Sequence, residues 1–164
     1  MDSRTPEDRH EHAQDLFQQA YRAQMTGDWE RAAELYKASL EILPTAEAHT
    51  FLGWTYHFQG KIEDAIDECK RAIEVDPDFG NPYNDIGAYL IEQGKWDEAI
   101  PWFQKAMIAP RYEARSYPHF NLGRVYEHRG NWTKAKECYA MAFALESRYG
   151  AALAGIRRMR AALN

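Results

Sequence analysis

The chain contains the stretch Leu52-Gly53-Trp54-Thr55-Tyr56, which is followed by Gly60, Ala65, Ala72 and Pro77. Two glycines seven positions apart, Gly53 and Gly60, are the central feature of this stretch. A small residue lets two helix backbones approach closely, and glycine readily adopts the left-handed conformation that a tight turn requires. The stretch therefore predicts two packed helices joined by a short turn.

The same pattern recurs four times along the chain. The turn glycines are spaced 33, 34 and 36 residues apart, at Gly27, Gly60, Gly94 and Gly130. The small residue of each first helix is Ala20, Gly53, Gly87 or Gly123. A period near 34 residues with small residues in register indicates a helical repeat rather than an accidental series of helix pairs.

The pattern resembles the tetratricopeptide repeat, whose units begin with a Leu-Gly pair and close with a proline. The resemblance covers nearly the whole chain. It implies an all-α fold, an α-solenoid of four helix-turn-helix repeats followed by a C-terminal capping helix, in a single domain over residues 1–164. The expected repeats span residues 13–45, 46–79, 80–115 and 116–148, and the capping helix spans residues 148–163.

Signals for helix starts and ends place nine helices. Thr5 and Asp8 form a capping pair around Pro6, which suits the first position of a helix. This first helix is longer than a repeat needs, so its first two turns are expected to project as an extension. The predicted helices are residues 5–26, 29–43, 46–59, 62–75, 81–93, 96–109, 117–129, 132–146 and 148–163.

The last helix reads as a cap that Ser147 begins. An apolar face of Tyr149, Leu153, Ile156 and Leu163 is expected to cover the fourth repeat.

The segment 109–118, which joins the third and fourth repeats, is longer than the other joins. It is either a functional loop or a tolerated insertion.

Charge and composition limit the classes of partner. The net charge of −5 argues against nucleic acid as a partner, because phosphate binding needs a dense basic surface. After Glu146 the chain has four arginines and no acidic residue, so the remainder carries −9. Three of these arginines, Arg157, Arg158 and Arg160, either face solvent or dock an acidic partner.

Nothing in the sequence indicates a cofactor, a metal site or a membrane segment. The two cysteines, Cys69 and Cys138, are 69 residues apart and read as reduced packing residues. No run approaches 18 apolar residues, and Met1–Gln14 is too polar for a signal peptide, so we expect a cytoplasmic protein without membrane insertion. No catalytic motif is present, and we expect no enzyme activity.

The resemblance to tetratricopeptide repeats also implies a binding groove. In that family the first helix of each repeat lines an inner groove, where partners bind as extended peptides or helices. Aromatic rings in such a groove serve as anchors, and amides bond the peptide backbone. In the alternative reading, rings such as Phe17, Phe51 and Trp54 pack between neighbouring helices as core. The candidate groove residues are Phe17, Tyr21, Thr50, Trp54, His57, Phe58, Asn81, Asn84, Asp85, Tyr117, Phe120, Asn121 and Arg124.

The residues disfavour one known ligand class of the family. Repeats that bind chaperone C-termini clamp the terminal carboxylate with Lys, Asn and Arg side chains on the inner face. The matching positions here hold mainly aromatic residues, and Asp85 would repel a carboxylate.

The sequence therefore predicts a non-enzymatic adaptor that binds a protein or peptide partner in an aromatic and amide-rich groove. The alternative is a structural scaffold that acts through homo-oligomerisation or the assembly of a larger complex. The residues do not name the partner.

Overall fold

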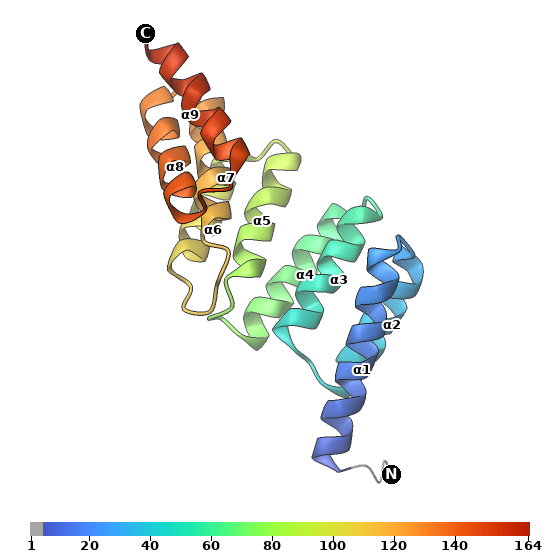
Figure 1. Cartoon of the computed structure of the whole chain (residues 1–164). Coiled ribbons are helices and arrows are strands. Elements are labelled where there is room, and N and C mark those ends of the chain that lie inside the picture. Colours follow the sequence, from blue (N-terminus) through green and yellow to red (C-terminus); the bar gives the residue numbers. More distant parts are fainter. Residues whose placement is uncertain (1–4) are drawn as a thin grey trace. The chain divides into compact units, whose positions relative to one another are not determined.

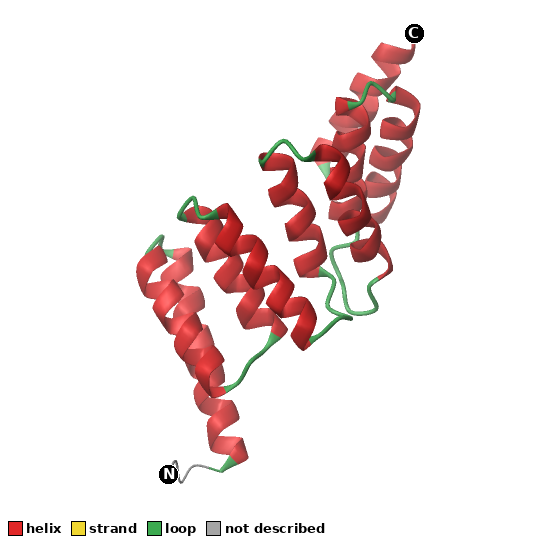
Figure 2. Ribbon diagram, turned by 180° about the vertical axis from the view of Figure 1, so that it is seen from behind, coloured by secondary structure: helices red, strands yellow, loops and turns green. Residues whose placement is uncertain are grey.

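The computed structural model describes residues 5–164, which form nine α-helices and no β-strand (Figure 1 and Figure 2). This confirms the predicted all-α class. The predicted polar start, Met1–Gln14, lies partly outside the described residues. The helices are α1 (Pro6–Met25), α2 (Trp29–Ile42), α3 (Ala46–Phe58), α4 (Ile62–Val75), α5 (Asn81–Glu92), α6 (Trp96–Ile108), α7 (Ser116–His128), α8 (Trp132–Leu145) and α9 (Gly150–Leu163).

Consecutive helices pack as pairs, α1 with α2, α3 with α4, α5 with α6 and α7 with α8, and α9 packs on α8. The turn glycines have φ between 72° and 80°, which favours glycine because it has no Cβ. Within the pairs, a Cβ added to Gly123 would lie 2.7 Å from the ring of Tyr139. The two roles predicted for the repeated glycines are therefore confirmed.

The chain divides into two compact units, residues 1–79 and residues 80–164. We call them unit 1 and unit 2. The core of unit 1 is centred on Tyr36, which is fully buried with Ala20, Ala32 and Leu52. In unit 2, Tyr139 is fully buried among residues of α8 and α9. Each unit thus has a core of its own.

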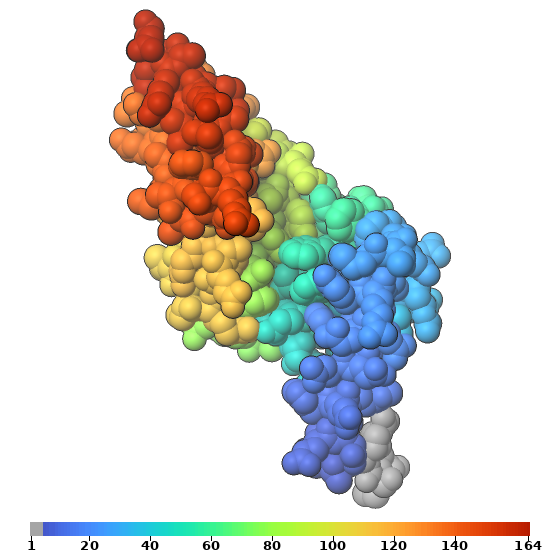
Figure 3. Space-filling model, viewed as in Figure 1, coloured from blue at the N-terminus to red at the C-terminus, as the bar shows by residue number. Residues whose placement is uncertain are grey.

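The first turns of α1 extend past the repeat, as expected. Thr5 and Asp8 form the predicted capping box. Residues 5–12 are all exposed, and Figure 3 shows this end of α1 standing clear of the other helices of unit 1. The Arg9 guanidinium ties this end to α2 by donating to the carbonyl of Ile42 at 3.1 Å.

The long join between α6 and α7 is ordered by its own contacts. The Tyr112 side chain is buried against Gly80, where an added Cβ would lie only 2.3 Å from it. The Arg115 guanidinium donates to the carbonyl oxygens of Met107 at 2.7 Å and Ala109 at 2.8 Å. These carbonyls lie at the end of α6, so the join closes that helix and packs within unit 2.

The start of α9 differs from the prediction. The helix begins at Gly150 after Tyr149, and Ser147 does not cap it. The prediction was wrong because residues 146–150 form turns, in which the Tyr149 amide donates to the Glu146 carbonyl at 3.0 Å.

The buried face of α9 also differs in part. It consists of Ala152, Gly155, Ile156 and Met159, whereas Leu163 is 44% exposed. Gly155 lies against the ring of Tyr139, which brings the two helices close at this point. Among the basic residues, Arg157 and Arg160 are exposed, while Arg158 bonds the carboxylate of Glu127.

Candidate functional site

The candidate groove residues fall into two sets, one in each unit. In unit 1 they come from α1 and α3, the first helices of their pairs. We call Phe17, Tyr21, Trp54, His57 and Phe58 the unit 1 face, together with Phe51, which was not a candidate but contacts three of these rings. In unit 2 they come from α5 and α7. We call Asn81, Asn84, Asp85, Tyr117, Phe120, Asn121 and Arg124 the unit 2 face.

The rings of the unit 1 face form one connected cluster around Phe51. Its centroid lies 5.3 Å from Phe17 and 5.7 Å from Tyr21, both edge to face, and 4.8 Å from Trp54. Phe17 also contacts the buried Tyr36 at 5.4 Å, so it belongs partly to the core. Phe17, Phe51 and Trp54 are each half-buried, so these rings pack as part of the core and also keep some exposed surface.

The turn end of the same face is more exposed. Phe58 is 56% exposed and stacks on Trp29 with centroids 4.5 Å apart and ring planes 12° apart. His57 lies beside it at 5.7 Å. Trp29 was not among the candidate residues, although its place two residues after the turn glycine Gly27 is visible in the sequence.

Thr50 does not belong to this face. Its side chain is 1% exposed, and its hydroxyl donates to the Ala46 carbonyl at 2.7 Å. Thr50 fails as a groove residue because this helix position, which holds the half-buried Phe17 and Phe120 in other repeats, points into the core in α3. A hydroxyl that bonds the carbonyl four residues earlier is satisfied and needs no ligand.

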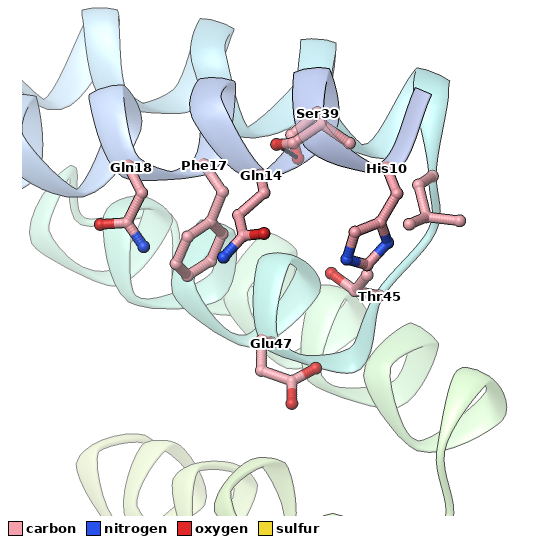
Figure 4. A pocket seen from close by; sticks show the side chains of 9 residues that line it. His10, Gln14, Phe17, Gln18, Ser39, Thr45 and Glu47 are labelled. Atoms are coloured by element: carbon pink, nitrogen blue, oxygen red, sulfur yellow. Dashed lines mark hydrogen bonds between the residues drawn. The ribbon is translucent and has the colours of Figure 1, made fainter. Parts of the chain in front are cut away.

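A cavity of about 350 Å³ lies at the other end of the unit 1 face, between α1 and the start of α3. Figure 4 shows Gln14, Phe17 and Gln18 pointing from α1 toward α3. The wall is part apolar and part amide, which suits a side chain flanked by peptide groups. The lining residues are His10, Ala13, Gln14, Phe17, Gln18, Ser39, Leu43, Thr45 and Glu47.

The unit 2 face is polar and internally bonded. The Arg124 guanidinium donates to Asn121 Oδ1 at 3.2 Å, and Asn121 Nδ2 donates to Asn84 Oδ1 at 3.1 Å. Arginine can only donate, so it fixes the direction of this chain of bonds. Asn84 and Asn121 are each only 9% exposed, so a ligand can meet only their edges.

Three tyrosines of unit 2, Tyr112, Tyr117 and Tyr149, interact electrostatically with one another, and only Tyr117 was a candidate from the sequence. Tyr117 is 50% exposed and lies 5.5 Å from Tyr149. Burial raises the pKa of Tyr149 to about 12, with Tyr117 adding to the rise and Arg124 opposing it. Burial likewise raises the pKa of Tyr112, and the charge of Asp85 raises it further. Both hydroxyls therefore remain protonated at neutral pH.

Phe120 joins the unit 2 face to its core. Its ring lies 4.7 Å from Tyr149 and 5.4 Å from Tyr139. Phe120 is thus packed against α8 and against the segment before α9. These contacts join residues far apart in the sequence, so they could not be predicted from it. Asn81 and Asp85, on α5, are half-buried.

The described residues contain no group of three His, Cys, Asp or Glu side chains that could hold a metal ion. Neither Cys69 nor Cys138 forms a disulfide bond. Burial raises the pKa of Cys138 to about 11, which leaves its thiol protonated and unreactive at neutral pH.

Within residues 5–164, no helix has the length and apolar character needed to cross a membrane.

Comparison with protein families identifies the repeats. Four family profiles described as tetratricopeptide repeat match residues 16–47, 46–79, 68–100 and 116–149. Three of these matches fall on the pairs α1 and α2, α3 and α4, and α7 and α8. The match to residues 68–100 instead covers the second half of α4, all of α5 and the start of α6.

Individual relatives agree with this assignment. Small glutamine-rich tetratricopeptide repeat-containing protein 2 of Mycosarcoma maydis is 30% identical over 58% of this chain and 27% of its own length. Photosystem I assembly protein Ycf3 of Prochlorococcus marinus is 29% identical over 62% of this chain and 65% of its own length. The chain thus spans less than two thirds of either relative.

A solved structure shares the fold. The structure titled "Functional Characterization of Pseudomonas Aeruginosa pilF" superposes with a TM-score of 0.85 and 24% identity, over 92% of this chain and 68% of that one.

Proposed function

Because the chain belongs to the tetratricopeptide repeat family, we propose that it is a non-enzymatic adaptor that binds a peptide or helix of a partner protein. The faces used are those of α1 and α3 in unit 1 and of α5 and α7 in unit 2. One observation carries this proposal: Tyr21 and Phe58 remain 38% and 56% exposed at the edges of a packed ring cluster. Exposed aromatic anchors beside amides are typical of protein-binding surfaces.

The unit 2 face contributes hydrogen-bond donors. The direction fixed by Arg124 turns the Asn84 Oδ1 toward Asn121 and leaves the Asn84 Nδ2 as a donor toward a ligand. The protonated hydroxyls of Tyr112 and Tyr149 are further hydrogen-bond donors of unit 2. These groups suit the carbonyl oxygens of a peptide backbone, which every peptide presents regardless of sequence.

A scaffold that acts through self-association is the second candidate. Its support is a set of exposed apolar side chains on the outer helices of unit 2. Ile108 is 80% exposed on α6, and Met141 and Leu145 are about half exposed on α8. Light scattering over a concentration series distinguishes the two functions, because a scaffold of this kind would grow in mass as the concentration rises.

A pull-down from the source organism tests the adaptor function. Wild-type protein is compared with Trp54→Ala, which removes a ring of the unit 1 face, and with Trp132→Ala, which removes a 37% exposed ring at the start of α8. We expect one set of partners to be lost with Trp54→Ala and retained with Trp132→Ala. Equal recovery by all three proteins would contradict the role of the unit 1 face.

A further inference from the structure

The unit 1 face lies in the acidic part of the chain. Residues 1–79 contain 17 Asp and Glu against 8 Lys and Arg, whereas residues 80–164 contain 8 against 12. The division into units therefore separates a strongly negative unit from a positive one. Because surface charges add over a Debye length of about 8 Å, unit 1 attracts cations and repels anions.

The unit 1 face contains no lysine or arginine. Helix α3 contains neither lysine nor arginine. On α1, Arg9 is bonded to the end of α2, and Arg22 lies about 100° around the helix from Tyr21. On these two helices, the exposed Arg22 is therefore the one Lys or Arg side chain that could compete with a ligand cation for the rings.

The rings themselves can hold a cation. An ammonium or guanidinium group within about 6 Å of a ring centroid is attracted by the negative face of the ring. The chain already makes such contacts elsewhere, since the Lys105 ammonium lies 4.7 Å from the centroid of Trp102. Tyr21 and Phe58 offer exposed ring surface for the same contact on the unit 1 face.

The cavity at the end of the face fits the other part of such a ligand. Phe17, Ala13 and Leu43 give it an apolar wall, while Gln14 and Gln18 can bond a peptide backbone. Its volume of about 350 Å³ accommodates a large apolar side chain.

We propose that the unit 1 face binds a peptide segment in which Arg or Lys residues alternate with large apolar residues. Apolar side chains enter the cavity beside Phe17, and the cations lie over the rings of Tyr21, Trp54 and Phe58. This inference rests on the proposed adaptor function and adds the charge and composition of the ligand. Acidic peptides and a second copy of the chain are the competing occupants.

Two short synthetic peptides test the charge preference. They share the same apolar residues, and one carries Arg where the other carries Glu. In calorimetric titrations of the full chain, we expect the Arg peptide to bind at least about tenfold more tightly at low salt. The preference should shrink as the salt concentration rises from about 0.05 M to about 0.5 M, because the Debye length falls.

Three variants locate the binding. Trp54→Ala should weaken the Arg peptide roughly 30-fold, as expected for an aromatic anchor. Phe58→Leu keeps an apolar side chain but removes the ring face, so it should weaken the Arg peptide more than the Glu peptide. Trp132→Ala in unit 2 is the matched control and should bind like wild type. Circular dichroism confirms that all three variants are folded.

The outcomes separate this inference from the proposed function. If the Glu peptide binds as tightly as the Arg peptide and Trp54→Ala weakens both, the face binds peptides but the charge preference is wrong. If neither peptide binds the folded wild-type protein, the inference and the proposed role of the unit 1 face both fail. If Trp132→Ala weakens the Arg peptide as much as Trp54→Ala does, the ligand lies elsewhere and the inference is overturned.

Discussion

Gly87 has almost no room for a side chain, because a Cβ there would lie 2.5 Å from the ring of the fully buried Phe103. Gly87→Leu should therefore destabilise the protein by about 3 kcal/mol, through overpacking between α5 and α6. Urea denaturation measures the change. Gly150→Ala is the control, since nothing lies within 4 Å of a Cβ at that position. A loss below about 0.5 kcal/mol for Gly87→Leu would show that the two helices do not pack closely.

The carboxylate of Glu127 links three elements of unit 2. It accepts two bonds of 3.0 Å from the Arg158 guanidinium and one from the Tyr139 hydroxyl. The bonds from Arg158 hold the pKa of Glu127 below its ordinary value of 4.5, while partial burial opposes the shift. A carboxyl group with a lowered pKa stabilises the fold above its unfolded pKa, and this stability is lost as the pH falls through the folded value.

Glu127→Gln should accordingly destabilise the protein by about 1 kcal/mol at neutral pH, because the charge-assisted bonds to the half-exposed Arg158 weaken. Below the lowered pKa, wild type and variant should be equally stable. Denaturation at pH 7 and at successively lower pH values measures the difference, with the exposed Glu137→Gln as control. A stability difference that does not change with pH would contradict the assignment.

At the scale of single residues, the sequence predicts turns and close contacts better than it predicts exposure. Glycines at fixed spacing identify the tight turns and the close approaches between helices, because a Cβ fits poorly in either place. Phe17, Thr50, Asn84 and Phe120 occupy equivalent positions ten residues before their turn glycines, yet their exposures and contacts differ. These differences in exposure and contacts depend on the neighbouring side chains. The position of a residue within the repeat does not predict them.

Among the elements, α9 makes a testable contribution to unit 2. It covers Tyr139 through Gly155 and buries Ile156 and Met159. Deleting residues 148–164 should expose this apolar surface and cause aggregation or a lower Tm. Deleting only residues 161–164, which are all exposed, should leave Tm unchanged. A soluble deletion of residues 148–164 with an unchanged Tm would show that α9 is not a cap.

The join between α6 and α7 depends on Arg115. Its guanidinium bonds two carbonyl oxygens at the end of α6, and these would otherwise lack a partner in the helix. Arg115→Ala should cost about 2 kcal/mol and make residues 110–115 more sensitive to proteolysis. The exposed Arg157→Ala is the control. Equal proteolysis of both variants would mean that Arg115 does not order the join.

Helix bounds could be predicted to within about two residues. Eight of the nine follow from caps, turn glycines and closing prolines, all of which are local signals. The start of α9 was misplaced because Ser147 has the chemistry of a cap, while the packing of Tyr149 on Phe120 places the turn later. Local chemistry cannot reveal such a tertiary contact.

For the whole molecule, the repeat pattern predicts four similar helix pairs but not their division into two units. The boundary lies between Phe79 and Gly80, and the regular spacing of the turn glycines gives no sign of it. The division matters for function, because it separates the aromatic unit 1 face from the polar unit 2 face. It also separates an excess of acidic residues from an excess of basic ones.

We expect the partner to be recognised by α1, α3, α5 and α7 rather than by the basic residues of α9. Once a partner has been identified, its Kd should be measured for wild type, Trp54→Ala and the double variant Arg157→Ala, Arg160→Ala. Arg158 is left intact because it bonds Glu127. We expect Trp54→Ala to weaken binding roughly 30-fold and the double variant to bind like wild type. Binding that survives Trp54→Ala but is lost in the double variant would contradict the account.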